Sequence, residues 1–94
     1  MRIVWQDEAL NDFEEIIAYY RQEAGPIVAE LMEASMLSQI ENLKTIPLKI
    51  RVSERIAGAR ELVMQRLPYI AFVRVTDETI QIINIVHTAK MLPD

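Results

Sequence analysis

The stretch RELVMQRLPYIAFVRVTDETIQIINIVHT, residues 60–88, decides the fold of this 94-residue chain. It contains three runs rich in β-branched and aromatic residues, and such runs are typical of strands. The runs cover residues 60–66, 69–75 and 80–86. Leu67 and Pro68 separate the first two, and the polar segment 76–79 is short enough to be a hairpin loop. We therefore predict three consecutive antiparallel strands.

The last of these runs is apolar on both faces. Strict alternation places Ile80, Ile82 and Val86 on one side of the sheet, and Ile83 and Ile85 on the other. A strand that is apolar on both faces is usually a central strand with other elements packed over it. The rest of the chain is therefore expected to supply helices that cover the sheet.

The first half of the chain predicts one strand and two helices. Met1–Trp5 has the character of a short strand, and Asp7–Glu23 shows helical periodicity with Asp7 as its N-cap. Gly25 and Pro26 end this helix and begin a second one, which stops near residues 45–47. The predicted apolar stripe of the first helix is Leu10, Phe13, Ile16, Ile17 and Tyr20. That of the second is Val28, Leu31, Met32, Ser35, Met36, Ile40 and Leu43.

The connection between the second helix and residue 58 is basic and ambiguous. Its alternating pattern, residues 48–57, is compatible with an extended edge, but we assign it as a loop. The predicted fold class is therefore α+β: an N-terminal strand, an antiparallel helical hairpin, and a three-stranded antiparallel meander that completes a four-stranded sheet. Residues 1–94 are predicted to form one domain.

Composition argues against several classes of function. No run approaches 18 apolar residues and no basic-then-apolar leader opens the chain, so we expect a cytoplasmic protein without a membrane partner. Cysteine is absent and there is one histidine, which makes a zinc site improbable. The two glycines, Gly25 and Gly58, do not form a phosphate-binding loop, so no cofactor is expected.

The charges are strongly segregated along the sequence. Residues 1–43 contain two basic and nine acidic residues, whereas residues 44–74 contain seven basic and two acidic residues. Residues 75–94 contain one basic and three acidic residues. Such asymmetry indicates a partner surface on the basic segment. The alternative is a solvated face that only balances the acidic helices.

Three short motifs resemble the RelE/ParE superfamily of bacterial type II toxins. They are GARELV at 58–63, LPYIAFVRV at 67–75 and INIVHTAK at 83–90, and the predicted order of elements is also similar to that of the superfamily. The resemblance covers essentially the whole chain. It implies a toxin that is neutralised by a cognate antitoxin protein.

The resemblance leaves two targets open. The RELV and PY pair looks more like the ParE-like branch, which is associated with plasmid stabilisation and inhibits DNA gyrase by binding, without a catalytic group. The alternative is a RelE-like, ribosome-dependent endoribonuclease that cleaves mRNA without a metal. The sequence departs from the pattern of many relatives at Ala57, Asn84, Lys90 and Met91. A decayed toxin that only binds its antitoxin is a third reading.

The candidate site residues differ between these hypotheses. A gyrase-directed surface would use the following predicted target-binding residues: Arg60, Arg66, Arg74, His87 and Lys90. A ribonuclease would use Arg60 and Arg66 as cations, Tyr69 as a hydrogen-bond donor and His87, with its ordinary pKa of about 6.5, as acid or base. Even spacing predicts that Arg60 and Arg66 share one strand face.

Two of these residues also have plainer readings. His87 is expected more readily as a polar residue that ends an apolar strand and bonds to nearby backbone. Arg74 lies in the middle of an apolar strand, so it is expected to be partly buried and paired with Glu61.

Overall fold

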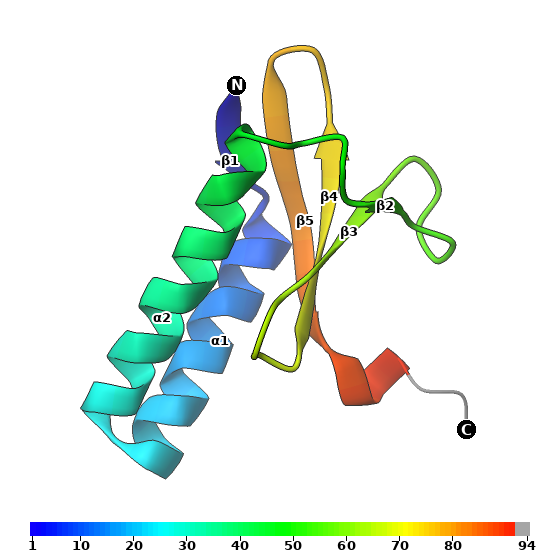
Figure 1. Cartoon of the computed structure of the whole chain (residues 1–94). Coiled ribbons are helices and arrows are strands. Elements are labelled where there is room, and N and C mark those ends of the chain that lie inside the picture. Colours follow the sequence, from blue (N-terminus) through cyan, green and yellow to red (C-terminus); the bar gives the residue numbers. More distant parts are fainter. Residues whose placement is uncertain (92–94) are drawn as a thin grey trace.

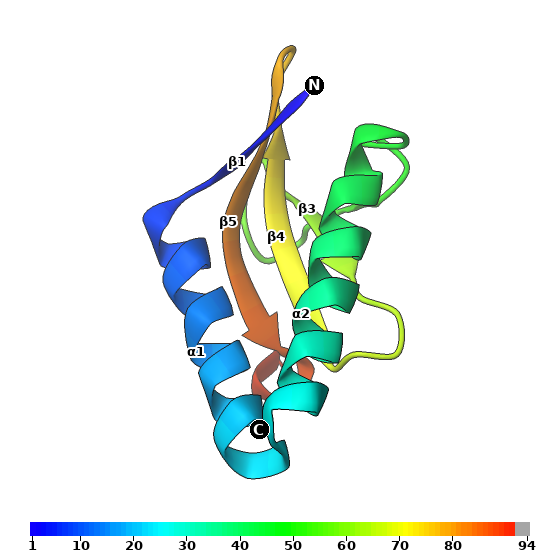
Figure 2. The same cartoon turned by 90° about the vertical axis from the view of Figure 1, so that its left-hand side faces the viewer.

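The computed structural model describes residues 1–91 and places two helices against one face of a five-stranded sheet (Figure 1). The elements in chain order are β1 (Arg2–Trp5), α1 (Asp7–Ala24), α2 (Pro26–Glu41), the short 3-10 helix η1 (Asn42–Lys44), β2 (Arg51–Val52), β3 (Arg60–Val63), β4 (Tyr69–Val75), β5 (Thr79–His87) and the 3-10 helix η2 (Thr88–Met91). Viewed from the helix side, α1 and α2 lie side by side in front of the sheet (Figure 2).

The sheet contains the predicted antiparallel meander, but the strands around it differ from the prediction. Its strand order is β1-β5-β4-β3-β2, and β3, β4 and β5 pair antiparallel as predicted. β1, however, runs parallel to β5; α1, α2 and the strands β2 to β4 separate the two in sequence, so no hairpin turn joins them. The sheet is therefore mixed.

A fifth strand lies where a loop was predicted. β2 pairs antiparallel with β3, with Arg51 opposite Glu61 and Val52 opposite Arg60. The side chains of Arg51 and Glu61 also bond to each other, which favours the extended conformation over a free loop. The chain then turns back through Gly58, whose φ of 75° is readily adopted only by glycine.

The helix boundaries agree with the sequence, but the predicted N-cap of α1 does not. Gln6 is the N-cap of α1 and makes no side-chain capping bond, so Asp7 is the first helical residue rather than the cap. Its carboxylate still lies in the first turn, where the helix dipole favours negative charge. Gly25 joins the helices with a φ of 91°, and Pro26 opens α2 as predicted.

The buried stripe of α2 is rotated from the predicted one. Ala29, Met36 and Ile40 are fully buried, whereas Leu31 is 67% exposed and Val28 is 38% exposed. On α1, likewise, Ile17 is buried as predicted but Leu10 is exposed. α2 carries apolar residues on nearly every side, so periodicity alone cannot select the face that packs.

A β-bulge changes which residues of β5 face the helices. Phe72 pairs with Asn84 and Val73 pairs with Ile82, which leaves Ile83 as the extra residue. The buried, helix-facing residues are therefore Ile80 and Ile82 before the bulge and Ile85 after it. The predicted grouping of Val86 with Ile80 and Ile82 is wrong, because one inserted residue reverses the alternation.

The core is formed between the helices and the central strands β4 and β5. Its helix-facing sheet residues are Tyr69, Ala71, Val73, Ile80, Ile82 and Ile85. Phe72, which alternates with the core residues Ala71 and Val73 and so points to the opposite face of the sheet, is 3% exposed. The β2–β3 loop and the C-terminal turn lie on the side of the sheet away from the helices (Figure 1). Within residues 1–91, no helix is long and apolar enough to cross a membrane.

Candidate functional site

The five residues predicted to bind the target do not share one surface. Arg60 pairs with Val73, a core residue, and so points to the helix-covered face of the sheet. Arg74 follows Val73 on β4 and therefore points to the opposite face. The other three lie elsewhere: Arg66 in the β3–β4 turn, His87 at the end of β5 and Lys90 in η2.

Arg60 supports the connection between α2 and β2. Its Nη1 donates to the carbonyl oxygen of Ile50 at 2.9 Å and to that of Leu48 at 3.3 Å. These bonds satisfy carbonyl groups that have no helical or sheet partner, since the chain is irregular there. Arg60 thus has a structural role, whatever else it contacts.

Arg66 does not continue the strand of Arg60. β3 ends at Val63, and Arg66 is exposed in the following turn with a φ of 65°. This left-handed conformation is uncommon for a residue with a side chain. The predicted shared strand face of Arg60 and Arg66 is therefore wrong, because the chain turns before the second arginine.

Arg74 is half-buried as expected, but its partner is not Glu61. Its Nη2 donates to the carbonyl oxygen of Ala57 at 3.4 Å. Glu61 instead accepts from Arg51 Nη2 at 2.6 Å and from the Ser53 hydroxyl at 2.7 Å. Arg74 therefore contacts the β2–β3 loop directly, while a separate acidic residue holds that loop.

Glu61 is the buried charge that fixes the β2–β3 loop. Burial alone would raise the pKa of its carboxyl, but hydrogen bonds from Ser53 and Arg51 and the charges of Arg51 and Arg55 leave that pKa below its ordinary value. The Ser53 oxygen in turn accepts the backbone N–H groups of Arg55 and Ile56. One carboxylate thus orders the loop through a short chain of hydrogen bonds.

His87 lies in a groove at the edge of β5 that β1 leaves uncovered. The groove has a volume of about 610 Å³, and His87, Lys90, Tyr69 and Asn84 line it on one side. The carboxylates of Glu8, Asp12 and Glu15, together with Tyr19, line it from α1. His87 and Lys90 are therefore brought together, but they face an acidic helix rather than the basic segment.

Local hydrogen bonds explain the shape of this groove. Asp12 accepts the backbone N–H of Ile85 at 2.9 Å, which fixes α1 against the strand edge. His87 accepts the backbone N–H of Ala89 on Nδ1 at 3.0 Å, as expected for a polar residue that ends an apolar strand. The buried Oδ1 of Asn84 has no hydrogen-bond partner within residues 1–91.

The residues proposed for RNA cleavage do not converge. Tyr69 and His87 pack edge to face with ring centroids 5.2 Å apart. Tyr69 is 5% exposed, and burial together with its hydrogen bond to the Tyr20 hydroxyl raises its pKa. Arg60 is opposite Val73, four residues along β4 from Tyr69 and so roughly 13 Å away.

An exposed apolar stripe on α2 was not expected from the sequence. Ile27 and Leu31 are 72% and 67% exposed, and Val28 and Leu37 are also exposed. Residues 7–41 around this α2 stripe contain nine acidic residues and one basic residue, Arg21. The signal was present in the sequence, because a surface helix that is apolar on all sides has a face left over after the core is packed.

One family model and two solved structures are similar to this chain. The family model described as the ParE toxin of type II toxin–antitoxin systems, parDE, matches residues 3–92. A chain of the chromosomal ParDE TA system from P. aeruginosa superposes with a TM-score of 0.84 at 29% identity, over 93% of this chain and 95% of that chain. YafQ from E. coli strain BL21(DE3) has a TM-score of 0.61 at 11% identity, over 99% and 100% of the two chains, and so shares the fold. No curated protein sequence matches the chain.

Proposed function

We propose, since the chain belongs to the ParE toxin family of type II toxin–antitoxin systems, that it inhibits DNA gyrase by binding and is held inactive by a cognate antitoxin. The observation that carries this proposal is the family match over residues 3–92 together with the similarity to a ParDE chain. A cytoplasmic location follows from a target of this kind.

The arrangement of the side chains suits a binding toxin better than an enzyme. Tyr69 and His87 touch each other, but Tyr69 is buried, and α1 contributes three carboxylates to the groove that His87 lines. Carboxylates close to the site would repel a phosphate backbone rather than stabilise its developing charge. A toxin that captures one state of a large enzyme needs only a rigid complementary surface.

The antitoxin is proposed to cover the α2 stripe. Ile27 and Leu31 form an exposed apolar surface on a strongly acidic hairpin. The complementary partner is an amphipathic segment that buries apolar side chains on Leu31 and carries lysine or arginine beside the carboxylates. This assigns the antitoxin to the acidic half of the molecule.

The RelE-like alternative rests on one contact, the pair of Tyr69 and His87. Under that alternative, toeprinting on translating ribosomes would show new mRNA 5′ ends, and His87→Gln would abolish both cleavage and toxicity. Retention of toxicity by His87→Gln is the expected result.

A supercoiling assay with purified gyrase tests the proposal directly. The folded toxin is expected to inhibit supercoiling at a small molar excess, and stoichiometric antitoxin is expected to restore activity. No inhibition by folded protein at several-fold excess would contradict it. Normal growth of cells that express the toxin without antitoxin would instead indicate a decayed toxin.

A further inference from the structure

The edge of β3 is only partly covered by β2. Their pairing ends where Arg51 lies opposite Glu61, and the chain before Arg51 bends away from the sheet. β3 continues for two more residues, Leu62 and Val63. The second half of β3 is therefore an edge without a neighbouring strand in residues 1–91.

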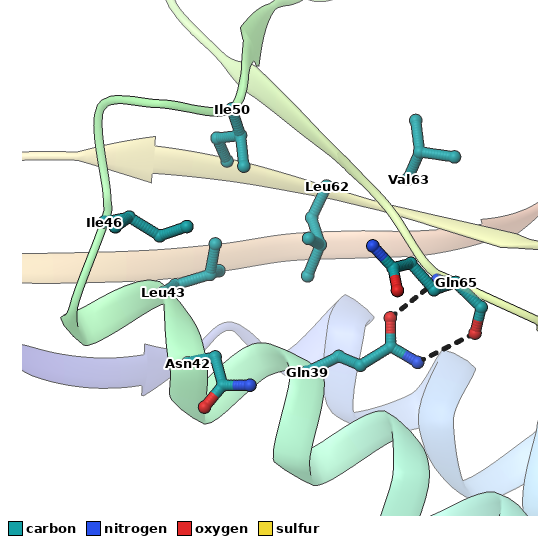
Figure 3. A pocket seen from close by; sticks show the side chains of 8 residues that line it. All are labelled: Gln39, Asn42, Leu43, Ile46, Ile50, Leu62, Val63 and Gln65. Atoms are coloured by element: carbon teal, nitrogen blue, oxygen red, sulfur yellow. Dashed lines mark hydrogen bonds between the residues drawn. The ribbon is translucent and has the colours of Figure 1, made fainter.

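The end of this edge is closed by a side chain instead of a strand. The Gln39 carboxamide of α2 accepts the backbone N–H of Gln65 at 2.7 Å and donates to the carbonyl oxygen of Gln65 at 3.0 Å (Figure 3). These are the two bonds that a paired strand residue would make. Gln39 thus occupies the place of a strand partner just beyond β3.

Val63 lies between these two closures and its backbone is open. The N–H of Met64 bonds to the carbonyl of Tyr69, so the even-numbered residues of β3 face β4. The odd-numbered residues face away from β4, and Glu61 accordingly pairs with β2. Val63 therefore directs its N–H and C=O outward, where residues 1–91 provide no partner.

An apolar pocket lies beside this open position. Leu43, Ile46, Ile50 and Leu62 face a common space of about 220 Å³, while the Val63 side chain points away from it (Figure 3). The pocket is smaller than the cavities that usually hold a small ligand, which begin at roughly 300 Å³. It is suited to one large apolar side chain, and Ile46 at its rim is 43% exposed.

Exposed cations adjoin pocket-lining residues in sequence. Lys49 precedes Ile50 and Arg66 follows Gln65, whereas Arg51 is bonded to Glu61 on the opposite face of the sheet. The nearby carboxylate of Glu61 is buried and already accepts from Arg51. An occupant with acidic residues beside its apolar side chain would therefore be complementary in charge.

We propose that the open backbone of Val63 and the adjoining pocket form a strand-addition site, here called the β3 gap, for an extended acidic segment of the toxin's protein target. One target residue pairs with both backbone groups of Val63. Its neighbour, which points to the other face of the extended segment, places an apolar side chain among Leu43, Ile46 and Leu62. This inference rests on the proposed function, because it assumes a target bound through protein contacts.

Val63→Pro tests the hydrogen bond without disturbing the fold's own ladder. Proline removes only the outward N–H, and such positions on edge strands accept proline. The variant is expected to inhibit gyrase about tenfold less well, since one target carbonyl loses its partner. Val52→Pro is the matched control: Val52 is also an exposed valine on an edge strand with an outward N–H, and it is expected to inhibit like the wild type.

Ile46→Asp gives an independent test if Val63→Pro does not fold by circular dichroism. An aspartate at the pocket rim should repel the acidic segment and lower inhibition by tenfold or more. Full inhibition by folded Val63→Pro or Ile46→Asp would overturn the β3 gap while leaving the proposed function intact. If the wild type arrests growth without inhibiting gyrase, the gyrase assignment fails, and the same variants then test the gap by growth arrest.

Discussion

The helical hairpin and the β3 edge are opposite in charge and in the way they present apolar surface. The hairpin exposes whole side chains, Ile27 and Leu31, on an acidic helix. The β3 edge instead presents open backbone at Val63 and a recessed pocket whose lining residues come largely from the basic segment 44–74. A helix face selects a partner through side chains alone, whereas a strand edge adds directional main-chain bonds. One small domain thus carries two surfaces that would choose chemically different partners.

The sharpest test of this comparison is a reciprocal pair of aspartate substitutions. Leu31→Asp should weaken antitoxin binding by about thirtyfold, or about 2 kcal/mol, because it places a charge at the centre of the apolar contact. It should leave gyrase inhibition unchanged, because Leu31 is 67% exposed and is not among the pocket-lining residues. Ile46→Asp should show the reverse pattern. Titration calorimetry and supercoiling assays measure the two effects, and equal loss of both activities in either variant would refute the separation.

A substitution at Glu61 tests the same comparison by destabilising the β2–β3 loop. Glu61→Ala removes the buried carboxylate that holds Arg51 and Ser53, and should lower the free energy of unfolding by about 2 kcal/mol. The loosened β2–β3 loop should impair target inhibition at temperatures where the protein stays folded. Antitoxin affinity should persist, since Glu61 pairs with Phe72 and so points to the face of the sheet away from α1 and α2. A variant that melts like the wild type would show that Glu61 does not order the loop.

The same carboxylate predicts a pH dependence. The folded-state pKa of Glu61 is lowered, so its stabilising contribution is complete above its ordinary unfolded pKa of about 4.3. The contribution is lost as the pH falls from there through the lowered folded-state value. Chemical denaturation between pH 6 and pH 3 should therefore show a steeper loss of stability in the wild type than in Glu61→Gln. Parallel curves would assign the acid sensitivity to other carboxylates.

The sequence predicted the topology of the meander and the helical hairpin well, because Pro26, Gly25 and the loop at 76–79 are strong local signals. It could not predict the bulge at Ile83, since an inserted residue leaves no mark in a run that is apolar on both faces. The prediction that Arg60 and Arg66 share a strand face was wrong for a similar reason, because local sequence did not show where the strand ends. Whether Arg60 and Arg66 share a face depends on where β3 ends, and just beyond that end the chain bonds to Gln39, a residue 26 positions before Gln65.

Gln39 offers a smaller perturbation of the β3 edge. Gln39→Ala removes two hydrogen bonds to Gln65 that are accessible to water, and should lower the free energy of unfolding by about 1 kcal/mol. It also exposes the N–H and C=O of Gln65 beside those of Val63, which lengthens the open edge. Hydrogen exchange at the Gln65 amide should accelerate in the variant. Unchanged exchange would mean that another group replaces the glutamine.

Substitutions at Arg74 and Arg66 compare a half-buried arginine with an exposed one. Arg74→Ala should lower both the melting temperature and the toxicity, because Arg74 is half-buried and bonds to the Ala57 carbonyl. Arg66→Ala should leave the melting temperature nearly unchanged, since exposed substitutions usually alter stability by less than about 0.5 kcal/mol. It should still relieve toxicity if the basic flank of the β3 gap attracts the target. Thermal melts and growth at matched expression measure both variants.

The smallest expected effect comes from replacing the same arginine with glycine. Arg66 has a φ of 65°, which strains any residue with a Cβ, so Arg66→Gly relieves strain that Arg66→Ala retains. The gain is offset by the greater freedom of glycine in the unfolded chain, and we expect a net stabilisation below about 1 kcal/mol. Both variants lack the guanidinium. If the charge of Arg66 attracts the target, they should lose toxicity equally despite their different stabilities. If toxicity instead follows the melting temperature, Arg66 acts only through the shape of the turn, and the basic flank is a solvated surface.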